Sequence, residues 1–289
     1  MRSRSVRVAD DVALHVLAWD GAPGVEPAFL LVHGLTSNAR TWEAVGDRLS
    51  GAGHRVVAAD LRGHGLSDKP ALGYNLSTMG DDIRNLIDEL DLDGAVAVGQ
   101  SAGGNLVVDL ASRHRGVLSG VVGVDGGSIE LADRWAVWDE CREALAPPPL
   151  EGTSSHEVES WLRRVHPDWP RWGIDATVAN LEVLDDGTVR PWLTLDRHIL
   201  ILRSLWEHRP SQLFPGITVP LMLVFADTGD DWAMTKRAEA ARATALRPDI
   251  RVEWFSPADH DVHVQRADEV AELIRSFGTG AVERASGGS

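Results

Sequence analysis

Short apolar runs that end at turn-forming residues recur along the chain, and stretches with helical periodicity separate them. The apolar runs occupy residues 28–33, 55–60, 95–99, 117–124 and 219–226. Short runs of this kind, bounded by Gly, Pro and Asp, are typical of buried parallel strands. Apolar residues at positions i, i+3, i+4 and i+7 within residues 83–90 and 270–277 predict amphipathic helices. The alternation predicts an α/β protein with a mostly parallel sheet and helices on both faces.

Residues 128–214 break this alternation. The segment contains three consecutive prolines, many charged residues and seven of the eleven tryptophans of the chain. We interpret it as a largely helical cap inserted into a core formed by residues 1–127 and 215–277. Residues 6–16 alternate between apolar and polar and predict a first strand or hairpin. The small and polar residues 278–289 predict a disordered tail.

Composition narrows the class of protein. Hydrophobic residues make up 44% of the 289 residues and charged residues 25%, as in soluble globular proteins. The net charge of −15 would repel a phosphate backbone, so nucleic acid is not an expected partner. No apolar run approaches the roughly 18 residues of a membrane span, and the amino-terminal residues do not form a signal peptide. The single cysteine, Cys141, excludes an internal disulfide. We therefore expect a cytoplasmic protein that binds no membrane.

Candidate chemistry is concentrated at residues 99–104, with the sequence GQSAGG. The segment matches G-x-S-x-G, in which a serine occupies a sharp turn between a strand and a helix. Small neighbours allow the backbone to approach closely, and a strand-like run precedes the motif while residues 105–115 can form a helix. The free N–H groups at the start of that helix would face a developing oxyanion. These features predict Ser101 as a nucleophile.

A second loop, with the sequence HGLT at residues 33–36, directly follows a predicted strand. Its backbone can direct an N–H group at the same oxyanion. We predict the N–H groups of Leu35 and Ala102 as the two donors of an oxyanion hole. His33 is expected to support this loop and not to act as the base.

A general base is predicted in the segment DHDVH at residues 259–263, between a strand-like run and the last helix. Such a base must accept the serine proton through one ring nitrogen and be oriented through the other. His260 is preferred, with His263 as the alternative. The acid that orients the base is predicted to be Asp230, with Asp227 and Asp125 as the other candidates, because all three follow predicted strands.

These landmarks together resemble the α/β-hydrolase superfamily over residues 6–277. The matching segments are 33–38, 60–68, 99–104, 124–127, 219–226 and 259–271. The resemblance implies a mostly parallel sheet of about eight strands flanked by helices, with a cap above the active site. It also implies Ser101 as nucleophile, His260 as base, and Leu35 and Ala102 as oxyanion donors. Ala226 and Gly229 occupy the places of the glycine and aspartate of the G-x-x-D turn that commonly carries the acid in this superfamily.

A serine at the nucleophile position implies an acyl-enzyme, whereas a carboxylate would be needed for an alkyl-ester intermediate. The main functional hypothesis is hydrolysis of a carboxylic ester or lactone, with a small apolar molecule as substrate and with no cofactor and no metal. The alternative is carbon–carbon bond hydrolysis, for which Arg163, Arg164, Arg190 and Arg197 are candidate anchors, or another acyl-transfer or lyase reaction on the same fold. A binding protein without turnover is the third hypothesis, and the presence of both Ser101 and His260 weighs against it.

Overall fold

A computed structural model describes residues 1–286 of the chain, and it describes the side chains through residue 282. Its main sheet has eight strands in the order β1-β2-β4-β3-β5-β6-β9-β10, and only the pairs β1–β2 and β2–β4 are antiparallel. The strands are β1 (Arg2–Ala9), β2 (Val12–Trp19), β3 (Phe29–Val32), β4 (Val56–Ala59), β5 (Ala95–Gln100), β6 (Leu118–Val124), β9 (Leu221–Ala226) and β10 (Arg251–Phe255). The predicted mostly parallel sheet is confirmed.

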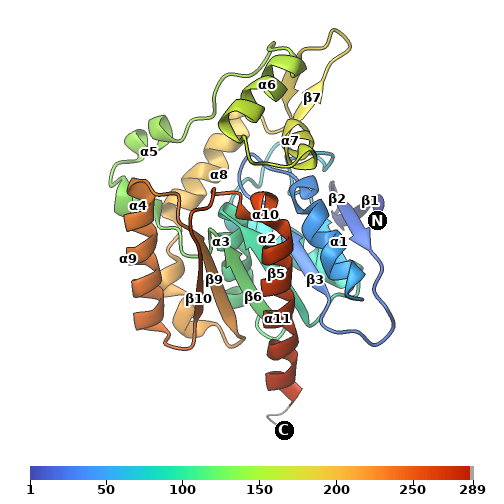
Figure 1. The fold of residues 1–289 in the computed structure, drawn as a ribbon, viewed down its shortest axis with the longest axis vertical. Helices are drawn as coiled ribbons and strands as arrows, with labels where there is room; N and C mark the ends of the chain where they lie inside the picture. Colours follow the sequence, from blue (N-terminus) through green and yellow to red (C-terminus); the bar gives the residue numbers. More distant parts are fainter. Residues whose placement is uncertain (287–289) are drawn as a thin grey trace.

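Helices cover both faces of this sheet (Figure 1). The helices α2 (Leu76–Glu89), α3 (Ala102–Arg113) and α9 (Asp231–Leu246) pack on one face. On the other face lie α1 (Glu43–Gly51) and α11 (Ala267–Ser286). The central strands β3, β4 and β5 are buried along their whole length, which explains why their sequences are continuous apolar runs without alternation.

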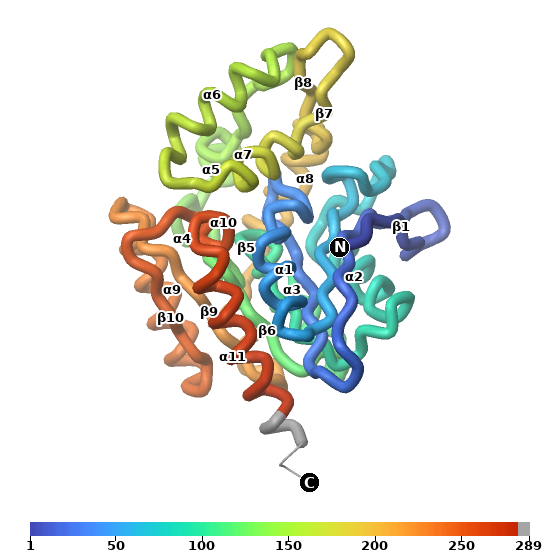
Figure 2. Tube along the Cα trace, turned by 45° about the vertical axis from the view of Figure 1, so that its right-hand side comes forward, coloured from blue at the N-terminus to red at the C-terminus, as the bar shows by residue number. Residues whose placement is uncertain are grey.

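The segment between β6 and β9 rises above the carboxyl ends of the parallel strands (Figure 2). It contains α4 (Leu131–Arg134), α5 (Trp138–Ala144), α6 (Ser155–Val165), α7 (Arg171–Val178), β7 (Leu181–Val183), β8 (Val189–Pro191) and α8 (Leu195–Glu207). Short 3-10 turns follow at Pro210–Gln212 and Phe214–Gly216. The segment is largely helical, and the small antiparallel sheet β7–β8 is an element that the sequence did not predict.

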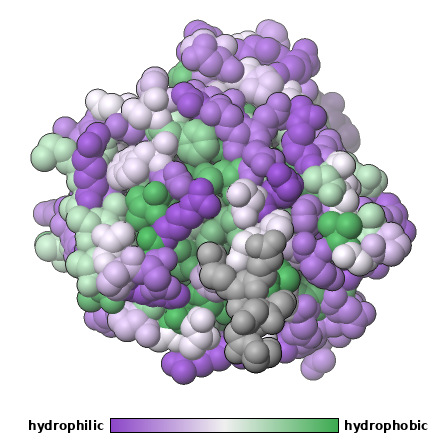
Figure 3. All heavy atoms as spheres, turned by 60° about the horizontal axis from the view of Figure 1, so that its bottom comes forward, coloured by the Kyte–Doolittle hydropathy of each residue, from purple (hydrophilic) through white to green (hydrophobic). Residues whose placement is uncertain are grey.

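The prediction of a disordered tail from residue 278 is wrong for residues 278–286, because α11 continues through Ser286. The extension has a packing partner: Ala281 is fully buried, and Gly278 lies against the ring of Phe29. Residues 287–289 lie outside the described residues. Figure 3 shows the end of the molecule opposite the cap, where hydrophilic and hydrophobic residues are interspersed. No helix within residues 1–286 is long and apolar enough to cross a membrane.

Candidate active site

Ser101 lies at a sharp turn between β5 and α3, as the sequence predicts. Its backbone has φ 53° and ψ −123°, a strained conformation for a residue with a side chain, and strain of this kind is concentrated at functional sites. The turn is so tight that a Cβ at Gly99 would collide with the backbone of Gly103. Glycine at both positions is what allows strand and helix to meet at this angle.

The loop that contains Leu35 passes directly beside Ser101. A Cβ at Gly34 would lie 2.9 Å from the Cβ of Ser101, and a Cβ at Gly103 would collide with the carbonyl group of His33. Among the described residues, the N–H of Leu35 has no hydrogen-bond acceptor. Ala102 is the first residue of α3, and the first N–H groups of a helix have no acceptor within the helix. The structure therefore brings together the two predicted oxyanion donors at Ser101.

His33 supports this loop, as the sequence analysis expects. It is fully buried, its Nδ1 lies 2.7 Å from the carbonyl oxygen of Gly34, and its Nε2 accepts the N–H of Leu61 at 3.0 Å. Burial lowers the pKa of His33, and the nearby charge of Asp60 opposes that shift only in part. A neutral imidazole with both nitrogens in use is a structural link between two loops and not an available base.

His260 forms a hydrogen bond with Asp125, with 2.6 Å between Nδ1 and Oδ2. Asp125 follows β6 with a positive φ of 44°, and its side chain is completely buried. The adjacent Gly126 packs so closely on Ser101 that a Cβ there would collide with the Ser101 carbonyl oxygen. The carbonyl oxygen of His260 accepts the side-chain amide of Gln100, the residue before Ser101, at 3.4 Å. Serine, histidine and aspartate from three distant parts of the chain therefore meet at one place.

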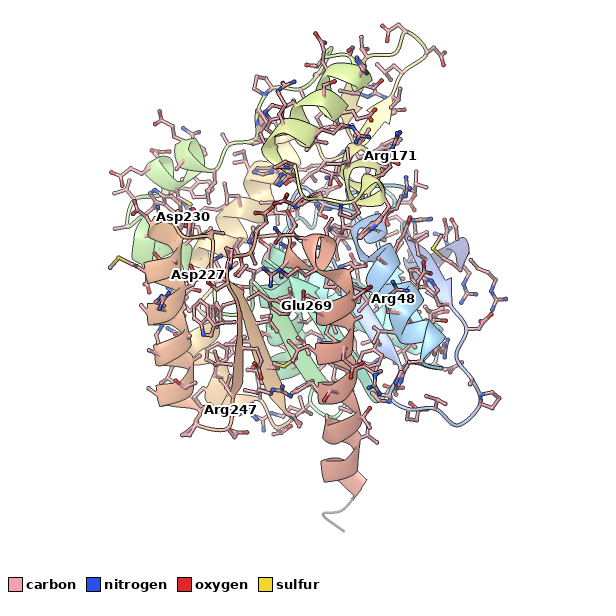
Figure 4. All side chains as sticks on the ribbon, viewed as in Figure 1. Arg48, Arg171, Asp227, Asp230, Arg247 and Glu269 are labelled. Atoms are coloured by element: carbon pink, nitrogen blue, oxygen red, sulfur yellow. The ribbon has the colours of Figure 1, made fainter. Side chains whose placement is uncertain are left out.

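The structure corrects the choice of carboxylate. Asp230, the preferred candidate, caps the start of α9 by accepting the N–H of Trp232 at 3.0 Å. Asp227 contacts Arg237 at 3.0 Å and accepts the N–H of Gly229. Figure 4 shows both aspartates at the outer edge of the sheet, around the beginning of α9. Neither of them bonds His260, and Asp125, the remaining candidate, does.

The pKa values of the pair shift in opposite directions. Burial by itself would lower the pKa of His260, but the hydrogen bond and the charge of Asp125 outweigh it and raise that pKa above 6.5. Burial by itself would raise the pKa of Asp125, but His260 and Lys236 outweigh it and hold the carboxyl below its ordinary value. The side chain of His260 retains 48% of its exposure, so the ring is accessible to a reacting molecule. The geometry suits a base that is oriented by an ionised carboxylate.

His263, the alternative base, does not fit this role. It is fully buried and stacks on Trp42, with the ring centroids 4.3 Å apart. Neither ring nitrogen has a hydrogen-bond partner among the described residues, and burial lowers its pKa to about 3. His263 is a neutral core residue.

Sequence reasoning missed Lys236. This lysine lies in α9, and its Nζ donates to Asp125 Oδ2 at 2.6 Å and to the carbonyl oxygen of Ala226 at 2.7 Å. No motif marks it. The only sequence signal is its place in the helix after β9, facing the sheet edge where the candidate aspartates gather.

The residue before His260 connects the core to the cap. Asp259 accepts the indole N–H of Trp169 at 2.8 Å and contacts Nδ1 of His166 at 3.2 Å. The rings of His166 and Trp169 stack with their centroids 3.9 Å apart. Asn38 adds a second link by donating to the carbonyl oxygen of Ala176 at 2.8 Å. The helical tip of the cap is thus held directly over the loop that carries His260.

A separate open groove of about 670 Å³ lies within the cap and is lined by Pro148, Leu150, Thr153, Glu157, Val158, Ser160, Trp161 and Arg164. Its lining includes none of Ser101, Asp125 and His260, so the chemistry assigns the site to the serine turn and not to this groove. Within residues 1–286, no group of three or more His, Cys, Asp or Glu side chains is placed to hold a metal ion.

A second histidine–aspartate pair lies beside a serine elsewhere in the described residues. Ser3 Oγ lies 2.8 Å from Nε2 of His15, and Nδ1 of His15 lies 2.9 Å from Oδ2 of Asp60. Asp60 also accepts the N–H groups of Ala39 and Leu66. Ser3 is an exposed residue of the edge strand β1. This second cluster provides an internal comparison for the first.

The fold is that of an α/β hydrolase, and the comparisons with known proteins agree with this class. The chain belongs to the alpha/beta hydrolase family, whose model matches residues 29–273, and it is a hydrolase. It is 30% identical over 261 residues to 2-(acetamidomethylene)succinate hydrolase of Mesorhizobium japonicum, covering 88% of each chain.

Solved structures show the same similarity. The crystal structure of E-2-(acetamidomethylene)succinate hydrolase superposes with a TM-score of 0.78 at 27% identity, over 96% of this chain and 98% of that one. The enol-lactonase from Burkholderia xenovorans LB400 superposes with a TM-score of 0.67 at 20% identity, over 96% of this chain and all of that one, and this likeness concerns the fold.

Proposed function

We propose that the protein hydrolyses an acyl compound through an acyl-enzyme on Ser101, with His260 as general base and Asp125 as the orienting acid. The observation that carries this proposal is the hydrogen bond between His260 and the buried Asp125 beside a serine at a strained strand-to-helix turn. The same elements recur in hydrolases in which a histidine activates a serine for attack on a carbonyl carbon.

The steps follow from the positions of these groups. Ser101 Oγ attacks the carbonyl carbon while Nε2 of His260 takes the proton, and the carboxylate of Asp125 stabilises the imidazolium that forms. The N–H groups of Leu35 and Ala102 bind the oxyanion, and each such donor is worth about 3–4 kcal/mol in the transition state. His260 then returns the proton to the leaving atom, and water releases the acyl group from Ser101.

The proposed substrate class is an N-acyl compound, from which an acyl group is transferred from nitrogen to Ser101. The support is the relative that acts on 2-(acetamidomethylene)succinate, because it matches 88% of both chains and its named substrate contains an acetamide group. This reaction is within the acyl-transfer alternative of the sequence analysis, and it takes precedence over a simple ester or lactone.

Carbon–carbon bond hydrolysis, the other reaction considered in the sequence analysis, has less support. It requires a cation that is available to anchor the substrate. Three of the four arginines considered for this role are engaged elsewhere, and the fourth, Arg164, lines the separate groove within the cap. Arg163 pairs with Glu159 and Arg190 pairs with Glu182, both on exposed parts of the cap. Arg197 donates to the carbonyl oxygen of Lys69. Ester or lactone cleavage remains the second candidate, because a serine that attacks an amide carbonyl also attacks the more reactive ester.

The proposal is tested by assaying E-2-(acetamidomethylene)succinate beside p-nitrophenyl esters of graded chain length. Each substrate is given to the wild-type protein, to Ser101→Ala and to the matched control Ser3→Ala. We expect turnover of the acetamido compound, a loss of about 10⁶-fold in kcat in Ser101→Ala, and wild-type rates in Ser3→Ala. Turnover of the esters alone would replace the N-acyl class by the ester class. Activity that persists in Ser101→Ala would contradict the whole mechanism.

A further inference from the structure

The ammonium group of Lys236 is buried beside the proposed catalytic acid. Its side chain is only 11% exposed, and its Nζ has two protein acceptors, Asp125 Oδ2 and the carbonyl oxygen of Ala226. A buried charge is costly unless an opposite charge and hydrogen bonds compensate it. The carboxylate of Asp125 supplies that compensation, so the lysine and the aspartate depend on each other. Activation of a serine by histidine and aspartate does not by itself require such a lysine.

Lys236 and His260 share one oxygen atom. Both Nζ of Lys236 and Nδ1 of His260 lie 2.6 Å from Oδ2 of Asp125, so the two nitrogens lie within about twice that distance of each other. The other oxygen, Oδ1, accepts the N–H of Ala226 at 2.9 Å. Together, the hydrogen bonds from Lys236, His260 and Ala226 hold the plane of the Asp125 carboxylate in place. During the reaction, His260 becomes a cation next to an ammonium that is already present, and like charges at this separation repel.

We propose that Lys236 is a positioning residue for the Asp125–His260 pair, which keeps Asp125 ionised and aligned and restrains His260 from binding a proton. This inference rests on the proposed function and deepens it. The lysine keeps His260 neutral, and hence able to act as a base, at lower pH than the aspartate alone would allow. The cost is a weaker stabilisation of the imidazolium in the transition state.

Other titratable groups surround the pair and are unchanged in the variants proposed below. They are Asp230 and Glu239 of the α9 segment, Asp259, Asp261 and His263 of the loop and short helix after β10, His166 of the cap, and His33 of the oxyanion loop. Glu239 matters most here, since burial raises its pKa to about 7 and it titrates in the same range as a histidine. Because it remains in every protein compared, its titration contributes to each profile.

The first experiment measures kcat/KM against pH for the wild-type protein, Lys236→Met and Lys236→Arg, with Arg237→Met as matched control. Arg237 is the next residue of α9, and its side chain is 66% exposed and pairs with Asp227. Protonated His260 cannot accept a proton, so activity appears as the pH rises through the pKa of His260. Without the lysine charge the protonated form is favoured, and we expect the acidic limb of Lys236→Met to move up by about one pH unit. Lys236→Arg and Arg237→Met should keep the wild-type limb.

The second experiment needs no substrate. The ring nitrogens of His260 are followed by NMR in ¹⁵N-histidine-labelled wild-type protein and in Lys236→Gln, which keeps a donor without a charge. We expect a higher titration midpoint in the variant. Equal midpoints, or an unmoved limb in Lys236→Met, would overturn the inference. If the kinetic assays found no turnover, the NMR titration would still decide the role of Lys236, so a failure of this inference and a failure of the proposed function are distinguishable.

Discussion

Two clusters of serine, histidine and aspartate stand at different places in this molecule. In one, His15 and Asp60 lie 2.9 Å apart beside Ser3 on the edge of the sheet. In the other, His260 and Asp125 lie 2.6 Å apart beside the turn that carries Ser101. The residue types and the histidine–aspartate contact are the same in both clusters.

The clusters differ in what surrounds the serine. Ser3 lies within a regular strand and pairs with Leu17 of β2, so no helix begins at it and no loop is pressed against it. Ser101 has a strained backbone, a helix that starts at the next residue, and a glycine loop in contact with its side chain. The exposure of the histidine also differs. His15 is buried with a relative exposure of 7%, whereas about half of the His260 side chain is exposed. We therefore expect that contact among a serine, a histidine and an aspartate is not by itself enough to make an active site.

The largest effect expected from this comparison is at Asp125, the aspartate that bonds His260. Asp125→Asn should lower kcat by about 10⁴-fold, because an amide no longer fixes the tautomer of His260 or stabilises its cation. The matched variant Asp230→Asn should stay within a few fold of the wild-type rate, since Asp230 caps α9 and accepts the hydroxyl of Thr228, away from His260. Steady-state kinetics on both variants checks this. A large loss in Asp230→Asn together with a small loss in Asp125→Asn would reverse our assignment of the acid.

A smaller effect, on stability, is expected at Asp60. Its carboxylate accepts N–H groups from His15, Ala39 and Leu66, and Asp60→Asn would place an amide N–H against one of these donors. We expect a loss of about 1–3 kcal/mol in the free energy of unfolding, measured by urea denaturation at neutral pH.

The stability contributed by Asp60 should also depend on pH. Burial by itself would raise the pKa of Asp60, but its hydrogen bonds, above all that from His15, lower it below 3.8. A carboxyl with a lowered pKa stabilises the fold above its unfolded-state pKa, and this contribution is lost as the pH falls through the folded-state value. The difference between the wild-type protein and Asp60→Asn should therefore shrink in acid. A difference that grows toward low pH would contradict this account.

The smallest effect is expected at Ser3. Ser3→Ala removes an exposed hydroxyl, and we expect a change within about 0.5 kcal/mol in stability. A fluorophosphonate probe should label the wild-type protein and Ser3→Ala equally, at Ser101, as peptide mass spectrometry would show. Labelling at Ser3 would mean that the histidine–aspartate contact alone activates a serine, and the distinction between the two clusters would fail.

Much of this protein can be predicted from local sequence. The apolar runs of β3, β4, β5, β6 and β9 mark buried strands because parallel strands are covered on both faces. The serine turn is equally local: glycines on both sides, a strand before and a helix after lie within about twenty residues. The region of His260 is recognisable because the DHDVH segment lies between a strand and the last helix. Only burial, which the sequence does not show, distinguishes His263 from His260. The expected disorder after residue 277 failed because composition does not show that Phe29 covers the extension of α11.

The sequence by itself determined the class of fold, the turn that carries Ser101 and the loop that carries His260, since each depends on residues that are neighbours in the chain. Only the tertiary structure decided which carboxylate meets His260 and that Lys236 joins them. His260 and Asp125 are 135 residues apart, and Asp125 and Lys236 are 111 apart. Parallel strands bring all of their carboxyl ends to one edge of the sheet, so several aspartates arrive there together. The packing of α9 and of the loop after β10 against that edge selects among them, and no local pattern records that packing.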